Sequence, residues 1–255
     1  MTWKQNLPRT VLITGASAGI GEACARKFAA AGCKLILTGR RRERLEALAQ
    51  ELPTSCLVLC FDIRNEEDTL RELSDLPAGF AEVDVLVNNA GLALGLDRIP
   101  AGNPSHWQQM IDTNISGMIY ATRAVLPGMV QRGRGHLIQL GSVAGTYPYP
   151  GGAVYAGTKA FVHQHALGMR SDLIGTPIRV TSIEPGAVET EFALVRFEGD
   201  KSRADAVYHG FRPLNGADIA ESIFWAATAP AHVNINVLEI MPVAQAFGGF
   251  AFDRR

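Results

Sequence analysis

Tyr155 and Lys159 lie four positions apart and could form a proton-transfer pair. The surrounding segment, VYAGTKAF, favours the opening of a helix, on which positions i and i+4 share a face. A phenol with a pKa of about 10 is a poor base near neutrality, but a nearby ammonium favours the phenolate. At about 4 Å and an effective dielectric near 20, the attraction is on the order of 4 kcal/mol, or about three pKa units before desolvation opposes it. We therefore predict a phenol pKa lowered into a useful range.

Ser142 precedes this tyrosine by thirteen residues, at the end of a predicted strand. Its hydroxyl could hold a reacting oxygen beside the tyrosine, either polarising a carbonyl or positioning an alcohol. A Tyr-x-x-x-Lys pattern alone also fits an amphipathic helix with a snorkelling lysine. The serine, together with the glycine-rich loop and the NNAG segment described below, favours a catalytic role for the tyrosine and lysine over that alternative.

Three glycines, Gly15, Gly19 and Gly21, follow a buried strand in the segment TGASAGIGEA and open a helix. Glycine allows a tight turn and a close backbone approach, and the helix N-terminus offers free N–H groups to a phosphate. A purely structural turn is the alternative. The position between strand and helix favours a dinucleotide phosphate site.

Arginines occupy the position where an NAD-binding fold usually has an acidic residue, about 20 residues after the glycine loop. The segment reads TGRRRERLEAL, with Arg40, Arg41 and Arg42 in succession. A solvated helix start is possible, but cations oppose the helix dipole there. Planar guanidinium donors match a 2′-phosphate, so we predict NADP rather than NAD, bound by Arg40 and Arg41.

Two further strand ends carry polar residues. Asp62 could accept a hydrogen bond from an adenine amino group or cap the next helix. In the segment NNAG, Asn88 and Asn89 could bind backbone groups freed by a turn, and Gly91 permits close approach of a cofactor. Together these residues predict a groove across the strand ends.

The fold predicted from hydropathy is α/β, because short apolar runs alternate with longer amphipathic segments. This rhythm indicates a single-domain, doubly wound, Rossmann-type parallel sheet with helices on both faces. One domain spans 1–255, with a cofactor half at about 8–140 and a catalytic and substrate half at about 136–255. The seven expected strands are 10–15, 34–39, 55–62, 83–90, 136–142, 179–185 and 236–241. The expected helices lie near 20–31, 41–51, 65–75, 105–131, 155–174 and 216–228.

Composition narrows the class of protein. The net charge is -1 and 19% of residues are charged, which argues against nucleic acid as a partner. The N-terminus lacks a signal sequence and no apolar run reaches membrane-spanning length, so we expect a cytoplasmic protein without membrane contact. The four cysteines lack metal-ligand spacing and are expected to be reduced. His163 and His165 point to opposite helix faces, so no metal site is predicted.

The sequence resembles the short-chain dehydrogenase/reductase family along essentially its whole length. The motifs that carry the resemblance are TGASAGIG, NNAG, Asn114 in MIDTNISG, Ser142 in LGSVAG, YAGTK, and PGAVET from Pro185 to Thr190. The resemblance implies that Tyr155 is the general acid/base, that Ser142 orients the substrate, and that Lys159 lowers the tyrosine pKa and binds the nicotinamide ribose. Asn114 would hold a water that connects the lysine to solvent.

The same resemblance implies an NADP contact set. Within PGAVET, Val188 and Thr190 would contact the nicotinamide carboxamide. The full set comprises Gly15, Ser17, Gly19, Ile20, Gly21, Arg40, Arg41, Asp62, Ile63, Asn89, Ala90, Gly91, Tyr155, Lys159, Pro185, Gly186, Val188 and Thr190.

The substrate half is similar to bacterial NADP-dependent 3-hydroxy acid dehydrogenases of the serine or 3-hydroxypropionate type. Sulfoacetaldehyde reductases are similar in the same segments, so a small anionic substrate is implied without a choice between carboxylate and sulfonate. Arg196, in the expected lid 191–212, is the predicted anion contact. Tyr147 and Tyr149 are pocket-wall candidates, although a plain loop role fits equally, and the tail 247–255 could be disordered or reach a neighbouring active site.

Other readings of the sequence stay open. An epimerase or dehydratase could share the fold and the Tyr-Lys pair, but such relatives usually append a larger substrate domain. A non-catalytic NADP-binding sensor would keep the glycine loop yet commonly lose the serine, tyrosine or lysine. The long helices at 105–131 and 155–174 and the strand near the end resemble surfaces by which family members form tetramers, so a homotetramer is expected.

Overall fold

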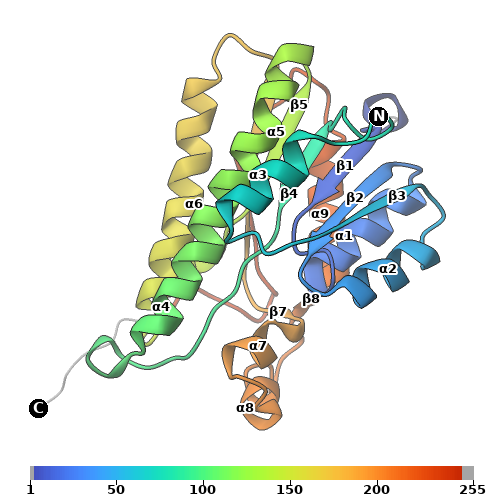
Figure 1. Ribbon diagram of the computed structural model, residues 1–255. Helices are drawn as coiled ribbons and strands as arrows, with labels where there is room; N and C mark the ends of the chain where they lie inside the picture. Colours follow the sequence, from blue (N-terminus) through green and yellow to red (C-terminus); the bar gives the residue numbers. More distant parts are fainter. Residues whose placement is uncertain (1–2, 249–255) are drawn as a thin grey trace, which may run out of the picture.

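Seven parallel strands form the central sheet of the computed structural model, which describes residues 3–248 (Figure 1). The order is β3-β2-β1-β4-β5-β6-β9, so the chain starts in the middle, runs to one edge and then returns to build the other side. This is the predicted doubly wound arrangement, and each predicted strand is present. The strands are β1 (Thr10–Ile13), β2 (Lys34–Gly39), β3 (Cys56–Cys60), β4 (Val85–Asn88), β5 (Gly135–Leu140), β6 (Ile178–Pro185) and β9 (Val237–Ile240).

Helices cover both faces of the sheet, and each face has its own apolar core (Figure 1). One face carries α1 (Gly19–Ala30), α2 (Arg42–Glu51) and α9 (Gly216–Ala227). The opposite face carries α3 (Glu66–Ser74), α5 (Met118–Arg132) and α6 (Ala153–Asp172). None of the helices within 3–248 combines the length and apolar character that crossing a bilayer would require.

The long helix predicted over 105–131 is interrupted. The structure has α4 (Pro104–Ile111), a π-helical segment at Asp112–Gly117, and then α5. The buried side chain of Asn114 lies in this π-helical segment, where a regular helix would rotate it to another direction. Gly117 packs so closely against Ile63 that a Cβ at this glycine would lie 2.8 Å from the isoleucine side chain. Hydrophobic periodicity carries no signal for such an insertion.

The predicted lid contains two short helices, α7 (Glu191–Arg196) and α8 (Lys201–Ala206). The sequence did not predict these helices, nor the small parallel sheet at their base, formed by β7 (Val188–Glu189) and β8 (Leu214–Asn215). We call residues 190–213 the lid segment. In Figure 1 it projects below the carboxyl ends of the central strands.

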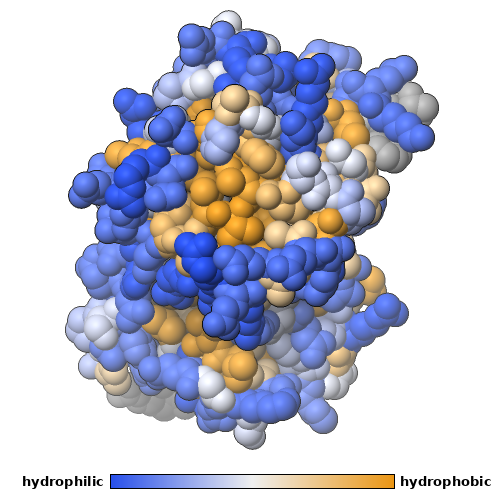
Figure 2. Space-filling model, turned by 45° about the vertical axis from the view of Figure 1, so that its right-hand side comes forward, coloured by the Kyte–Doolittle hydropathy of each residue, from blue (hydrophilic) through white to orange (hydrophobic). Residues whose placement is uncertain are grey.

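The strand β3 is only half-buried, because it forms an edge of the sheet. Figure 2 views this side and shows apolar surface bordered by hydrophilic residues. Cys24 and Cys33 are buried free thiols whose pKa values are raised by burial to about 12, whereas Cys56 and Cys60 on β3 are partly accessible. Residues 3–248 contain no group of three or more His, Cys, Asp or Glu side chains that could hold a metal ion.

Asp84 ties three segments together at the amino end of the sheet. Its carboxylate is 7% exposed and accepts hydrogen bonds from the backbone N–H groups of Arg9 (2.6 Å) and Thr10 (3.3 Å). Arg134, before β5, donates from Nε to the same carboxylate at 2.5 Å and also pairs with the exposed Glu82. The aspartate therefore fixes the start of β1 against β4 and β5.

We predict that Asp84→Ala lowers the free energy of unfolding by about 2 kcal/mol, because buried N–H donors and a cation lose their acceptor. Chemical denaturation with urea measures the change. Glu82→Ala is the matched control, since it removes the solvent-exposed partner of the same arginine and should cost less than about 1 kcal/mol. Equal effects of the two substitutions would contradict the anchoring role of Asp84.

Candidate active site

A cleft of about 650 Å³ runs along the carboxyl ends of the central strands. Residues from Gly15 to Gly248 line it, so it is assembled from nearly the entire chain. Two predicted site residues do not line it, because Gly21 and Asn114 lie behind its wall. The predicted residues that do are Gly15, Ser17, Gly19, Ile20, Arg40, Arg41, Asp62, Ile63, Asn89, Ala90, Gly91, Ser142, Tyr147, Tyr149, Tyr155, Lys159, Pro185, Gly186, Val188, Thr190 and Arg196.

The glycine loop between β1 and α1 is a tightly built turn. Gly15 and Gly19 have φ values of +66° and +58°, which L side chains rarely adopt. Gly21 serves packing rather than the cleft, since a Cβ there would collide with the Gly15 carbonyl oxygen. Asn89 donates from Nδ2 to the carbonyl oxygens of Thr14 (2.8 Å) and Gly15 (3.1 Å). Asn89 thus holds the backbone of the turn, as predicted. The same prediction for Asn88 is wrong, because its Nδ2 donates to the Thr122 hydroxyl at 2.9 Å instead.

Arg41 connects the glycine loop with the lid segment. Its Nε donates to the Ser17 hydroxyl at 3.1 Å, and its guanidinium forms an ion pair with Glu191 at 2.8 Å. Arg44, one turn further along α2, pairs with the same carboxylate at 2.7 Å but does not line the cleft. The hydrogen bonds from both arginines are the main cause of the lowered pKa of Glu191.

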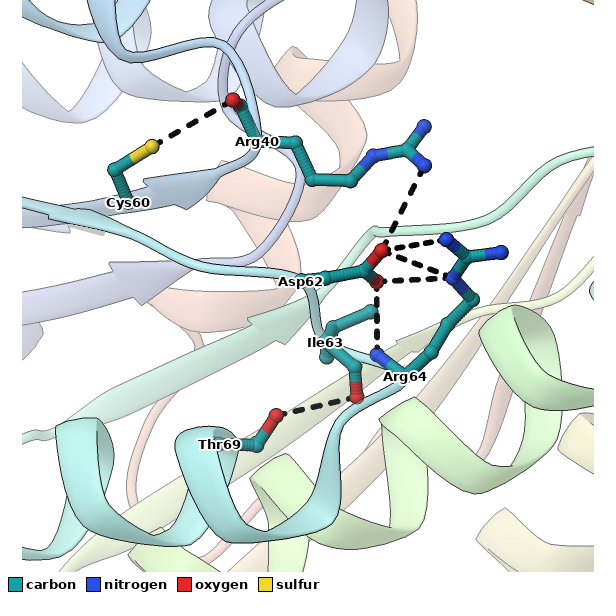
Figure 3. Close-up of polar contacts among 6 residues, drawn as sticks. All are labelled: Arg40, Cys60, Asp62, Ile63, Arg64 and Thr69. Atoms are coloured by element: carbon teal, nitrogen blue, oxygen red, sulfur yellow. Dashed lines mark hydrogen bonds and ion pairs between the residues drawn. The ribbon is translucent and has the colours of Figure 1, made fainter.

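Asp62 is engaged with arginines at the other wall of this end of the cleft (Figure 3). Arg64 donates to both of its carboxylate oxygens, at 2.6–3.0 Å, and Arg40 lies 3.8 Å away. Partial burial raises the pKa of Asp62, but the hydrogen bonds and charge of Arg64 outweigh burial and lower the pKa overall. The alternative of a helix cap is wrong, because Asn65 caps α3 by accepting from the N–H of Asp68.

Tyr155, Ser142 and Lys159 meet in the middle of the cleft, and all three are at least nine-tenths buried. Burial raises the pKa of Tyr155 to about 12, although a hydrogen bond with Ser142 opposes the rise. Lys159 donates from Nζ to the Leu140 carbonyl oxygen at 2.7 Å and lies 5.9 Å from the tyrosine ring centroid. Burial lowers the lysine pKa to about 8. The predicted lowering of the phenol pKa by the ammonium is therefore wrong for this structure, because burial raises the pKa and the groups that lower it, Ser142 and Arg196, do not offset burial.

Arg196 provides a second cation beside the phenol. Its guanidinium carbon lies 5.1 Å from the ring centroids of both Tyr155 and Phe192, and it donates to the Tyr149 hydroxyl at 2.8 Å. Its Nε is buried without a hydrogen-bond partner among residues 3–248. Of its two apolar neighbours in the chain, Phe197 is buried whereas Val195 is 43% exposed.

Asn114 is fixed behind the cleft by three hydrogen bonds. Its Oδ1 accepts from the Leu92 N–H at 2.8 Å, and its Nδ2 donates to the Leu92 carbonyl oxygen and the Thr158 hydroxyl. Leu92 lines the cleft between this asparagine and the cavity. The π-helical segment therefore holds the loop that follows β4 in place on the site side.

Sequence reasoning missed the part of the chain that follows β9. Gln245 accepts at Oε1 from the Ala187 N–H at 2.7 Å, and the Phe247 ring lies 4.4 Å from that of Tyr147, between centroids. Both residues line this chain's own cleft. The rest of the tail predicted to be disordered or to reach a neighbouring active site, 249–255, lies outside the described residues. The apolar character of Phe247 and Phe192 gave no signal, because it does not distinguish a pocket wall from core.

Comparisons with known proteins agree over nearly the entire chain. A family model described as short chain dehydrogenase matches residues 9–200. The chain is 54% identical, over 245 residues, to an NADP-dependent 3-hydroxy acid dehydrogenase of Salmonella typhi, covering 96% of this chain and 99% of that protein. It is 53% identical over 245 residues to a serine 3-dehydrogenase of Rhizobium radiobacter, covering 96% and 98%.

A solved structure described as the closed form of serine dehydrogenase complexed with NADP+ superposes with a TM-score of 0.95 at 50% identity. The match covers 96% of this chain and 100% of that one. The family model, these identities and the cleft geometry agree, and we conclude that the chain belongs to the short-chain dehydrogenase family.

Proposed function

We propose that this protein is an NADP(H)-dependent oxidoreductase that interconverts the hydroxyl and carbonyl forms of a small 3-hydroxy acid of the serine or 3-hydroxypropionate type. One observation carries the proposal: Ser142, Tyr155 and Lys159 converge in a cleft continuous with the glycine loop and two arginines. The names of the relatives, a 3-hydroxy acid dehydrogenase and a serine dehydrogenase, support the substrate class.

The cleft suits NADP chemically. At Gly15 and Gly19 the backbone can approach a pyrophosphate, and the start of α1 directs N–H groups toward it. Arg40 and Arg41 line the same end, and Ser17 lies beside the latter. These donors match a 2′-phosphate, and no acidic side chain stands at the end of β2 to accept a ribose 2′-hydroxyl. The nicotinamide, when bound, supplies or accepts the hydride.

The protein's own part in the reaction is proton transfer and orientation. In the reductive direction Tyr155 donates its phenolic proton to the carbonyl oxygen as that oxygen gains charge, and Ser142 orients the same oxygen. A phenol whose pKa is about 12 is protonated at neutral pH and ready to donate. In the oxidative direction the phenolate accepts the alcohol proton, and the nearby cations, Lys159 and Arg196, stabilise that charge.

Arg196 is the group we assign to the substrate's carboxylate. An anion that is removed from water in this cleft needs a cationic partner. The guanidinium faces the Tyr155 ring and has one buried N–H without an acceptor, so it can bind an anion without losing its bond to Tyr149. Lys159 is engaged with the Leu140 carbonyl, and Arg40 and Arg41 lie at the opposite end of the cleft.

Self-association into a tetramer is also part of this proposal. Exposed apolar side chains support it: Val130 on α5, Phe161 on α6, Trp225 on α9 and Val237 on β9 are each at least 37% exposed.

We predict that Tyr155→Phe lowers kcat for 3-hydroxypropionate oxidation by at least about a hundredfold, because the phenolic oxygen that accepts the alcohol proton is lost. NADPH affinity, measured by fluorescence titration, should change little, because the ring remains. Tyr120→Phe is the matched control, since Tyr120 is on α5 and does not line the cleft. A near-normal kcat in Tyr155→Phe would refute the assigned mechanism.

We predict that the double substitution Arg40→Ala and Arg41→Ala weakens NADPH binding by roughly ten- to a hundredfold, the value of charge-assisted hydrogen bonds to a phosphate. NADH binding should change much less, because it lacks that phosphate. Arg44→Ala separates this effect from loss of the lid contact, since Arg44 shares Glu191 with Arg41 but lies outside the cleft. Equal losses for the two cofactors would contradict a phosphate contact.

We predict that Arg196→Ala lowers kcat/KM for malonic semialdehyde reduction by roughly ten- to a hundredfold, with little effect on neutral propanal. The physical reason is the lost pairing of the substrate's carboxylate. Arg203→Ala provides the control, because Arg203 lies over the Phe197 ring in the same lid segment without lining the cleft. If both substrates lose equally in Arg196→Ala, the arginine has a structural role.

A further inference from the structure

A buried carboxylate lies directly behind Ser142 and the other reacting side chains. Glu184, on β6, is 2% exposed, and its Oε2 accepts from the Ser142 N–H at 2.7 Å. Its Oε1 accepts a short hydrogen bond from the Ser182 hydroxyl and lies 3.2 Å from Nδ1 of His163. The proposed mechanism does not use this carboxylate, although it contacts the backbone of the residue that is to orient the substrate.

The packing around this carboxylate is specific. Gly141 is the residue before Ser142, and a Cβ there would collide with the Glu184 carboxylate. The Gly141 N–H donates to the Ile183 carbonyl oxygen at 2.8 Å, which extends the pairing of β5 with β6 up to the site. The carboxylate therefore occupies the space of the missing side chain. The hydrogen bond between the Glu184 carboxylate and the Ser142 N–H fixes the position of the Ser142 backbone. It thereby fixes the Cβ that carries the serine hydroxyl.

The charge of Glu184 also acts on the reacting groups. Burial lowers the pKa of Lys159 to about 8, and the charge of Glu184 opposes this fall. The same charge adds to the rise in the Tyr155 pKa that burial causes. The titratable groups around Glu184 are Lys159, Tyr155 and His163 from α6 and, beside it in register on β9, Glu239.

We propose that Glu184 is a positioning residue that fixes Ser142 through its backbone and supplies the negative charge that keeps the buried Lys159 protonated. This inference rests on the proposed function, because it assigns Glu184 a task within that reaction. The two parts of the task depend on different properties, since fixing the serine needs an acceptor at the right distance whereas holding the ammonium needs a charge.

Glu184→Gln tests the charge, because the amide keeps the shape and an acceptor for the Ser142 N–H. The experiment is the pH profile of kcat for NADP-dependent oxidation of 3-hydroxypropionate, which has no titrating group of its own above its carboxylate range. Without the negative charge, the pKa values of Lys159 and Tyr155 both fall. The limbs of the profile should therefore move toward acid by about one pH unit, the effect of one nearby charge at intermediate dielectric.

Glu239→Gln is the matched control, because it removes an equal charge from the neighbouring strand without contact to Ser142. Its profile should keep the wild-type midpoints. Glu184→Asp keeps the charge but is one methylene shorter, so it should lower kcat roughly tenfold without an acid shift. Melting temperature and NADPH titration show which variants are folded, and either Glu184 variant alone still tests one part of the task.

Unchanged midpoints with a lowered kcat in folded Glu184→Gln would make the residue merely structural and overturn the assigned charge role. Wild-type kcat in Glu184→Asp would overturn the positioning of Ser142. The proposed function fails separately, because wild-type protein without NADP-dependent turnover of any small hydroxy acid refutes the function itself. An active wild type with unshifted variants refutes only the role of Glu184.

Discussion

The burial of the Lys159 ammonium is the constraint on which the cleft's construction depends. Taking a cation out of water is costly unless hydrogen bonds and an opposite charge replace the lost hydration. The Leu140 carbonyl oxygen at the end of β5 supplies the hydrogen bond, and Glu184 on β6 supplies the charge. The carboxyl ends of β5 and β6 must therefore lie level with each other. The residue after Leu140 must also lack a side chain, because a Cβ at Gly141 would collide with the Glu184 carboxylate. Ser142 is the next residue along.

The phenol faces the opposite problem, because its charged form is the one that burial disfavours. Burial outweighs the nearby groups that favour the phenolate, so Tyr155 holds its proton. Of the two cations near its ring, Arg196 belongs to the lid segment and Lys159 to the same helix. The positive charge near the phenol therefore depends on the position of the lid segment, which carries Arg196. The hydrogen bond between Tyr155 and Ser142 does not depend on the lid segment.

Much of the fold follows from local sequence, because buried parallel strands are continuous apolar runs and glycine turns have short signatures. The strands and the convergence of Ser142, Tyr155 and Lys159 were predicted in this way. The π-helical segment was not, because this short interruption leaves the apolar pattern of 105–131 nearly intact. Nor could the sequence reveal that Glu184 reaches Ser142, since that contact joins positions 42 residues apart, one on β6 and the other just beyond the end of β5. Residue spacing predicts which side chains share a face of one helix or strand. The burial of Tyr155 and the contact between Glu184 and Ser142 depend instead on how several elements pack together.

The ion pair between Arg41 and Glu191 joins residues 150 positions apart, at the mouth of the cleft. Both side chains are more than 40% exposed, so the pair is open to counterions from solution. At physiological ionic strength the screening length is about 8 Å, and it contracts to about 3 Å in molar salt. Dissolved ions therefore compete at one guanidinium both with the lid's carboxylate and with any phosphate it holds. Ionic strength should therefore change two quantities together: the strength of the ion pair between Arg41 and the lid segment, and the affinity for the nucleotide phosphate.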